Sequence, residues 1–259
     1  MKILIFLLYY NRPKLLRKCL QSLINANCYY QNWELIFGDD NSPIPGQQIV
    51  EEVLSKDLLK KVKFLKSNMS FEDKIKEGIS LGKHANLCLQ ESNADIAITL
   101  CDDDQLVPEY LRNISHFFET NTQQVWGYSH LAIFNPLYQN SSQVDLTNLK
   151  ECTYNQNKKP INPAGILDSS QVAYRISIID DEIKYPDTSK LNEGMPWLIN
   201  PDQYLFTKIY EKFGLCPFTG LVAQYKGIHE HQLVWHKKQG VVGLKEYIDK
   251  VHELGGKIF

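Results

Sequence analysis

Apolar residues in the first half of the chain are grouped in a way that predicts alternating strands and helices. Short apolar runs bounded by polar residues indicate buried strands at residues 3–9, 33–37, 62–65 and 96–101. Between these runs, apolar residues recur every three or four positions, which predicts amphipathic helices at residues 13–25, 46–60, 71–92 and 108–120. Such alternation is typical of an α/β fold in which helices flank a mostly parallel sheet.

The second half of the chain follows a less regular pattern. Its apolar runs predict strands at residues 124–134 and 215–224, helices at 202–213 and 243–251, and a strand or short helix at 170–179. The 259 residues fit one large α/β domain or two small ones. We therefore expect a regular first half joined to a half of mixed structure.

Polar residues follow three of the predicted strands, at the point where each strand ends. They form the groups Tyr10-Asn11-Arg12, Asp39-Asp40-Asn41-Ser42 and Asp102-Asp103-Asp104. Because ligands of open α/β sheets bind outside the carboxyl ends of the strands, we expect the three groups to converge on one edge. A site of this kind suits a nucleotide together with a metal ion.

Three consecutive aspartates place several negative charges at one strand end. Such carboxylates repel one another and raise each other's pKa unless a cation lies among them. Mg²⁺ or Mn²⁺ would neutralise residues 102–104 through their oxygen atoms and would also hold a phosphate. The simpler alternative is a solvated acidic turn before the helix that begins near Pro108.

The net charge, the cysteines and the lengths of the apolar runs argue against several classes of function. A net charge of −2 argues against a surface dominated by binding to nucleic acid or to anionic membranes. The six cysteines show no CxxC pair and no metal-ligand spacing, so we expect free thiols in a reducing, cytoplasmic compartment. No run approaches 18 apolar residues, which predicts the absence of a membrane-spanning helix but leaves peripheral membrane association open.

Four short elements between residues 9 and 108 resemble a family 2 type glycosyltransferase with a GT-A fold. They are Tyr-Tyr-Asn-Arg-Pro at residues 9–13, Phe-Gly-Asp-Asp-Asn-Ser at 37–42, Lys-His-Ala-Asn at 83–86 and Leu-Cys-Asp-Asp-Asp-Gln-Leu-Val-Pro at 100–108. The last three are similar to the family's Asp-Asp-x-Ser, Ala-x-Asn and Asp-x-Asp elements. One departure is Asn41 in place of the usual glycine, although asparagine tolerates the left-handed conformation that such a turn uses.

The resemblance implies an inverting, metal-dependent transferase that takes a sugar from a nucleoside-diphosphate sugar, with UDP favoured by the family. The acceptor would be a hydroxyl of a glycan or glycoconjugate, and Mn²⁺ or Mg²⁺ would be the cofactor. Residues 1–120 would form the nucleotide-sugar-binding half of one continuous domain. Residues 121–259 would form its acceptor-binding and catalytic-base half.

The resemblance also assigns roles to single residues. Donor binding would fall to a set at the strand ends and on the Ala-x-Asn helix: Tyr10, Arg12, Asp39, Asp40, Asn86, Asp102 and Asp103. Asp39 or Asp40 would accept a hydrogen bond from the nucleobase, and Arg12 would lie near the base or the phosphates. Asp102 would face the ribose, and Asp104, with Asp102 beside it, would bind the metal.

An inverting transferase also needs a general base that deprotonates the acceptor hydroxyl. In the family this is an acidic residue far downstream of the Asp-x-Asp, and Asp202 lies 98 residues after Asp104. Asp202 also suits an ordinary helix N-cap, and Glu193 is the second candidate for the base. His229 and His231, two residues apart, could ligate the metal, although a partly exposed polar pair is the simpler interpretation.

Two alternatives compete with an active transferase. A phosphatase of the Asp-x-Asp-x-Thr type also carries carboxylates after a strand, but Leu106 stands where threonine or valine is expected. A catalytically inactive glycan- or nucleotide-binding protein on the same scaffold would retain the carboxylates. Among the aromatic residues, we expect Trp126 to pack in the core, and Trp197 is a candidate platform for an acceptor sugar.

Overall fold

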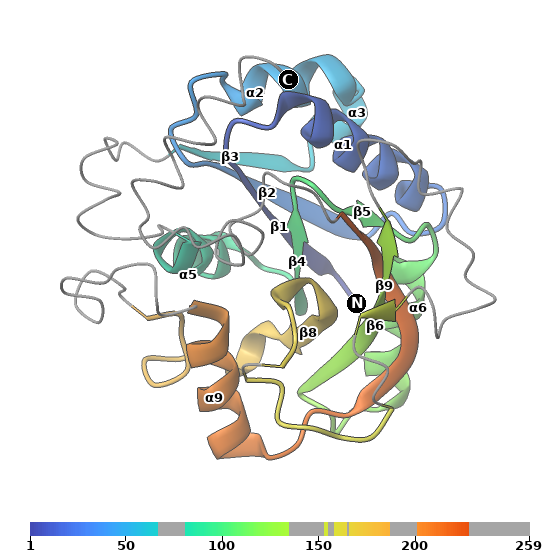
Figure 1. Ribbon diagram of the computed structural model, residues 1–259, viewed down its shortest axis with the longest axis vertical. Coiled ribbons are helices and arrows are strands. Elements are labelled where there is room, and N and C mark those ends of the chain that lie inside the picture. Colours follow the sequence, from blue (N-terminus) through green and yellow to red (C-terminus); the bar gives the residue numbers. More distant parts are fainter. Residues whose placement is uncertain (67–80, 135–152, 155–157, 165, 187–200, 228–259) are drawn as a thin grey trace.

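The computed structural model describes residues 1–66, 81–134, 153–154, 158–164, 166–186 and 201–227 (Figure 1). Its first four strands are β1 (Ile3–Tyr9), β2 (Trp33–Asp39), β3 (Val62–Lys66) and β4 (Ile96–Cys101). They are parallel in the order β3-β2-β1-β4, and Ile3 pairs with both Trp33 and Ile96. The carboxyl ends of these strands therefore lie at one edge of the sheet.

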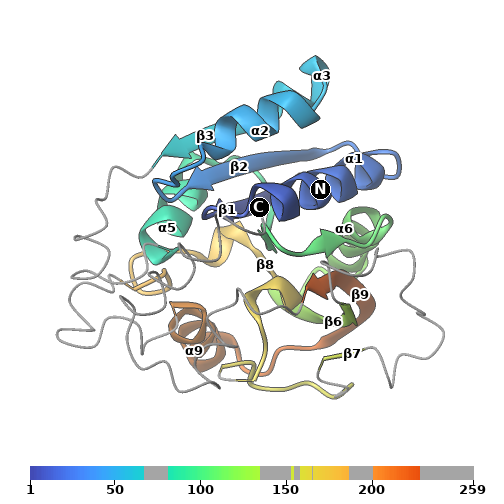
Figure 2. The same ribbon diagram turned by 45° about the horizontal axis from the view of Figure 1, so that its top comes forward.

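Helices cover both faces of this parallel part (Figures 1 and 2). Helices α1 (Pro13–Asn27), α2 (Gly46–Val53), α3 (Lys56–Leu59) and α6 (Tyr110–Thr120) contribute to one apolar cluster, together with Ile3, Ile5 and Leu7 of β1. Helices α5 (Leu81–Glu91) and α9 (Pro201–Phe213) contribute to a second cluster, together with Leu4 and Phe6. Because successive residues of a strand point to opposite faces, the two clusters lie on opposite sides of β1.

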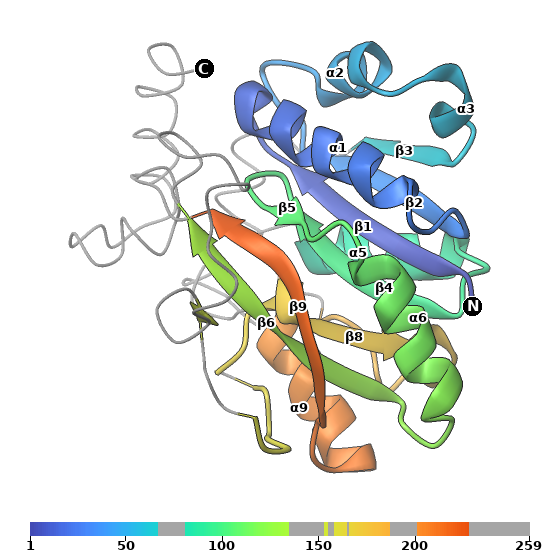
Figure 3. The same cartoon turned by 90° about the vertical axis from the view of Figure 1, so that its right-hand side faces the viewer.

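The second part of the sheet is mixed. Its strands are β5 (Gln105–Leu106), β6 (Trp126–Phe134), β7 (Thr153–Tyr154), β8 (Val172–Arg175) and β9 (Phe218–Gly227). The order of the sheet continues β4-β8-β6-β9-β5, and β7 pairs with β6. Strand β8 is antiparallel to its neighbours β4 and β6, whereas β9 is parallel to β6 (Figure 3). Two short 3-10 helices, η2 (Ser169–Gln171) and η3 (Ile176–Ile178), flank β8. This order brings the end of β9 next to β5, which follows the three aspartates.

The four parallel strands confirm the elements predicted from the apolar pattern, with small differences elsewhere. The helix predicted at 46–60 is divided, because Leu54 is extended and the Ser55 side chain caps α3. The strand predicted at 215–224 corresponds to β9, which begins and ends three residues later. Trp126 is buried in the core, as predicted.

Other predictions fall partly on residues that the structure does not describe. Residues 170–179 contain both a strand and a short helix. The helix predicted at 71–92 is described only from Leu81, as α5, and its residues 71–80 lie outside the described residues. The helix predicted at 243–251 and Trp197 also lie outside them. Within the described ranges, every helix is too short or too polar to cross a membrane. The described cysteines are free thiols at Cys19, Cys28, Cys88, Cys101 and Cys216.

Candidate active site

The three aspartates form a buried turn between β4 and β5. The N–H of Asp104 donates to the carbonyl of Cys101 over 3.1 Å and closes the turn. Asp102 and Asp104 have no exposed surface, and Asp103 is 5% exposed. A solvated acidic turn would leave these side chains in water, so the structure excludes that simpler alternative.

The first two aspartates bind the segment that connects β1 to α1. One guanidinium nitrogen of Arg12 lies 2.7 Å from Asp102, and the other lies 2.8 Å from Asp103. The N–H of Tyr10 also donates to Asp102 over 3.2 Å. Burial raises the pKa of Asp102 to about 7, and the charge of Arg12 opposes this rise. The polar groups after β1 and β4 therefore meet at one sheet edge, as expected from their positions.

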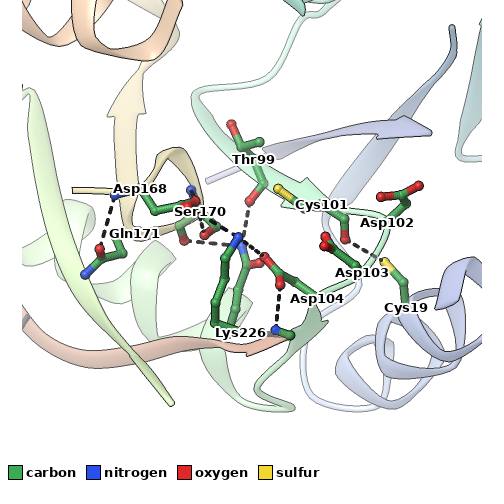
Figure 4. Close-up of polar contacts among 12 residues, drawn as sticks. Cys19, Thr99, Cys101, Asp102, Asp103, Asp104, Asp168, Ser170, Gln171 and Lys226 are labelled. Atoms are coloured by element: carbon green, nitrogen blue, oxygen red, sulfur yellow. Dashed lines mark hydrogen bonds and ion pairs between the residues drawn. The ribbon is translucent and has the colours of Figure 1, made fainter. Parts of the chain in front are cut away.

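The third aspartate binds the far end of β9. The ammonium of Lys226 lies 3.1 Å from one carboxylate oxygen of Asp104, and the N–H of Gly227 donates to the other over 2.9 Å (Figure 4). Burial raises the pKa of Asp104 to about 8, with Lys226 opposing the rise and the charge of Asp103 adding to it. In Figure 4, Asp102 points away from Lys226.

Asp168 joins the same cluster from the segment before β8. Its carboxylate accepts hydrogen bonds from the N–H and the hydroxyl of Ser170, over 3.1 and 2.6 Å, and lies 3.3 Å from the ammonium of Lys226. Burial raises the pKa of Asp168, but Lys226 and Ser170 outweigh that effect and hold the pKa below its usual value. Lys226 is thus shared between two carboxylates that come from different parts of the sheet.

Asp202 lies in the first turn of α9 and is 7% exposed. Burial, followed by the negative charge of Asp168, raises the pKa of Asp202 to about 7, while a hydrogen bond with Ser169 and the charge of Lys226 oppose the rise. The candidate base is therefore electrostatically linked, through Asp168 and Lys226, to the cluster around Asp104.

Sequence reasoning missed Asp168 and Lys226. Asp168 is part of a capping box with Gln171, which is an ordinary way to begin a short helix. Lys226 is one residue before the end of a strand, where a lysine carries no special signal. Only the three-dimensional structure shows that the Lys226 ammonium lies beside both Asp104 and Asp168 and so joins them in one cluster.

The loop after β2 is organised by Asp39. One carboxylate oxygen accepts the N–H of Ser42 and the other accepts the N–H of Gly46, both over 2.8 Å. The Ser42 hydroxyl accepts the N–H of Asn11 over 3.1 Å, which ties this loop to the one after β1. Asn41 has a φ of 54°, so it adopts the left-handed conformation that the sequence predicted for this turn. Asp40, next to Asp39, is 9% exposed.

The structure does not bring Asn86 together with the aspartates. Its side-chain amide donates to the carbonyl of Tyr185 over 2.9 Å and accepts the N–H of the same residue over 3.0 Å. Asn86 thus holds the backbone after η3 against α5. Glu193, His229 and His231 lie outside the described residues.

A metal ion fits the residues of the turn. Ligand atoms of Cys101, Asp103 and Asp104 all lie within 4.8 Å of one another, and this group does not include Asp102. The Lys226 ammonium beside Asp104 shows that this position already accepts a positive charge. Carboxylates suit Mg²⁺ and Mn²⁺, and the thiol is a softer donor that fits a transition metal better than Mg²⁺.

The fold is that of GT-A glycosyltransferases. The chain belongs to glycosyl transferase family 2, whose family model matches residues 4–182. The resemblance to this family that was inferred from the motifs is therefore confirmed. A search of curated protein sequences finds no match to the chain.

Solved structures support the same fold. S. aureus TarS 1–349 in complex with UDP-GlcNAc has a TM-score of 0.65 at 18% identity, over 89% of this chain and 59% of that one. The TarS 1–349 complex with UDP has a TM-score of 0.64 at 17% identity, over 89% and 62%. The mannosyltransferase PcManGT from Pyrobaculum calidifontis, in complex with GDP-Man and Mn²⁺, has a TM-score of 0.58 at 10% identity, over 97% and 68%. This chain spans about three fifths of the TarS 1–349 length.

Proposed function

We propose that this member of the family is an active glycosyltransferase, which moves a sugar from a nucleoside-diphosphate sugar to a hydroxyl of a glycan or glycoconjugate acceptor, with inversion and with a divalent metal ion. The observation that carries the proposal is the link between two acidic centres, one in the turn after β4 and one in the first turn of α9. Asp104 lies in the strand-end turn, and Asp202, with a pKa of about 7, is linked to it through Lys226 and Asp168. Residues 1–120 would bind the donor, and residues 121–259 would bind the acceptor and supply the base.

The donor would bind along the edge formed by the loops after β1, β2 and β4. Asp39 or Asp40 would accept a hydrogen bond from the nucleobase; both oxygens of Asp39 already accept backbone N–H groups of this loop. Asp102, fixed by Arg12 and the N–H of Tyr10, would face the ribose. TarS structures contain UDP and UDP-GlcNAc, and the PcManGT structure contains GDP-Man, which supports a nucleoside-diphosphate donor without choosing its base.

Asp104, Asp103 and Cys101 would hold the metal ion, for which we propose Mn²⁺ or Mg²⁺. When bound, such an ion would offset the negative charge that develops on the departing nucleoside diphosphate. The predicted ligands His229 and His231 follow the end of β9 in the sequence, two and four residues after Gly227. They stay candidates for the same site.

Asp202 would take the proton of the acceptor hydroxyl. A carboxyl with an ordinary pKa is a weak base, whereas a pKa near 7 matches the base to neutral pH. Burial supplies most of this rise, and the hydrogen bond with Ser169 gives the carboxylate a fixed partner. Glu193 stays the second candidate for this role.

A thermal-shift experiment combined with a turnover assay tests the proposal. UDP, GDP and their sugars are each added with and without Mn²⁺; a ligand at a hundred times its Kd stabilises the fold by about 2.7 kcal/mol. In the thermal-shift experiment, we expect one nucleotide to stabilise the protein more strongly when Mn²⁺ is present. In the turnover assay, we expect release of the nucleoside diphosphate from the corresponding nucleotide sugar. Asp104→Asn should remove the Mn²⁺ effect, whereas Asp57→Asn, at an exposed aspartate, should retain it.

Two results would contradict this function. Absence of a shift with every nucleotide would mean that the strand-end site does not bind such donors. Nucleotide binding without sugar transfer, to any acceptor or to water, would instead identify a catalytically inactive binding protein on the GT-A scaffold.

A further inference from the structure

The four carboxylates around the turn share two cationic side chains. Arg12 binds Asp102 and Asp103, as described above. Lys226 lies between Asp104 and Asp168 at 3.1 and 3.3 Å, and its side chain is 13% exposed. The protein therefore places its own positive charge on the aspartate that the proposed function assigns to the metal ion.

Asp104 has few ways to accept a further partner. The N–H of Gly227 occupies one of its oxygens at 2.9 Å, and the ammonium of Lys226 occupies the other. The group that could ligate a metal nevertheless includes Asp104, together with Cys101 and Asp103. An ammonium and a divalent ion cannot both come close to the same oxygen without strong repulsion.

The strand that carries Lys226 is anchored next to this residue, whereas the Lys226 side chain itself is flexible. Gln224, two residues earlier and on the same face of β9, donates to the carbonyls of Thr99 and Ser170 over 2.5 and 3.2 Å. These bonds fix the strand against β4 and η2. A lysine on a fixed strand can still swing its charge through four flexible carbons, so Lys226 can leave Asp104 while β9 stays in place.

We propose that Lys226 is an internal counter-ion that holds the place of the divalent ion on Asp104, so that metal binding displaces its ammonium. This inference rests on the proposed role of Asp104 as a metal ligand. The diphosphate of the donor offers the displaced ammonium a new anionic partner. Metal and donor therefore favour each other's binding, and the metal alone binds weakly.

Mn²⁺ titration followed by electron paramagnetic resonance tests this inference, because free and bound Mn²⁺ give different signals. The full chain is titrated without nucleotide as wild type, Lys226→Met and Lys226→Arg. We expect Lys226→Met to bind Mn²⁺ about tenfold more tightly or better, within the usual range of coupling between sites. Lys226→Arg retains the charge and should bind like the wild type.

Addition of UDP or GDP, whichever binds, provides a second measurement. The nucleotide should tighten Mn²⁺ binding in the wild type and should do so much less in Lys226→Met, because no ammonium is left to displace. Lys60→Met, which removes an exposed lysine paired with Asp57 at 2.7 Å, is the matched control and should leave both affinities unchanged.

The outcomes separate this inference from the proposed function. If folded Lys226→Met binds Mn²⁺ no more tightly than the wild type, while wild-type binding still depends on Asp104, the counter-ion role alone is overturned. If neither the wild type nor Lys226→Met binds Mn²⁺, with or without nucleotide, the metal site and the inference are both overturned. If Lys226→Met folds only with Mn²⁺, the ion replaces the ammonium and the inference is supported; failure to fold even at saturating Mn²⁺ would overturn it.

Discussion

The carboxyl of Asp202 lies within the electrostatic reach of Asp168, whose negative charge raises the pKa of Asp202 beyond the effect of burial. One aspartate begins α9 and the other caps η2, so their proximity is a product of the fold. Asp168 is itself held in its charged form by Lys226 and Ser170. The protein thus combines an ionised carboxylate, Asp168, with a carboxyl, Asp202, whose pKa lies near neutral pH.

The first prediction concerns the pH dependence of transfer. A base with a pKa of about 7 acts only when ionised, so kcat/KM should rise about tenfold per pH unit below pH 7 and level off above it. Asp168→Asn removes the charge that raises this pKa and should shift the acidic limb to lower pH. The measurement is a pH–rate profile of both proteins; identical limbs would remove Asp168 from this role.

Replacement of the candidate base should separate binding from chemistry. Asp202→Asn retains the size of the side chain but cannot accept the acceptor proton, so transfer should fall by about 10²–10⁴-fold. Donor affinity, measured by calorimetry, should stay near that of the wild type because the proposed function places the donor at other loops. Normal turnover in this variant would favour Glu193 as the base.

The same substitution should stabilise the protein at high pH. Because the pKa of Asp202 is about 7 in the folded protein and near 3.8 when unfolded, the native state binds more protons between these values. The free energy of unfolding therefore decreases as pH rises from about 4 to about 7 and is constant above. Asp202→Asn removes this cost, which is at most about 4 kcal/mol at pH 8. Urea unfolding at pH 5 and pH 8 measures it, and a gain that is larger at pH 5 would contradict the assignment.

Loss of Arg12 should destabilise the sheet edge. Arg12→Met leaves two buried carboxylates without their cation, a change that costs about 3–5 kcal/mol in buried ion pairs. Arg12→Lys retains the charge but cannot bind both aspartates with a planar fork, so we expect an intermediate loss. Arg17→Met removes an exposed pair with Glu52 and should cost far less stability in the same denaturation assay, because water screens such a pair. Equal effects of Arg12→Met and Arg17→Met would contradict this ranking.

The turn after β2 gives a backbone prediction. Asn41 has a φ of 54°, a conformation that costs side chains other than glycine and asparagine about 1–2 kcal/mol. Asn41→Val should therefore be less stable than Asn41→Gly by about that amount, as measured by urea unfolding. Similar stabilities for the two variants would mean that the turn relaxes to another conformation.

Local patterns were sufficient to predict the parallel half of the fold and the convergence of three loops. The apolar runs place the strands, and parallel strands bring residues 10–12 and 102–104 to one edge. Pairing between distant strands was not predictable from such patterns, so Lys226 and its contact with Asp104 were missed. The role of Asp39 in its own loop was also not predictable, because only the fold shows that both of its carboxylate oxygens accept backbone N–H groups.

The contact between Asp104 and the end of β9 has a consequence for how the enzyme assembles. The partners of Asp104 lie 122 and 123 residues later in the chain, and contacts between such distant residues form late because closing a long loop costs entropy. The aspartate turn therefore stays incomplete while the first half of the chain emerges and folds. Under the function proposed above, the donor site would be completed only by this late strand, so a half-folded chain would have no finished centre with which to cleave nucleotide sugars in water.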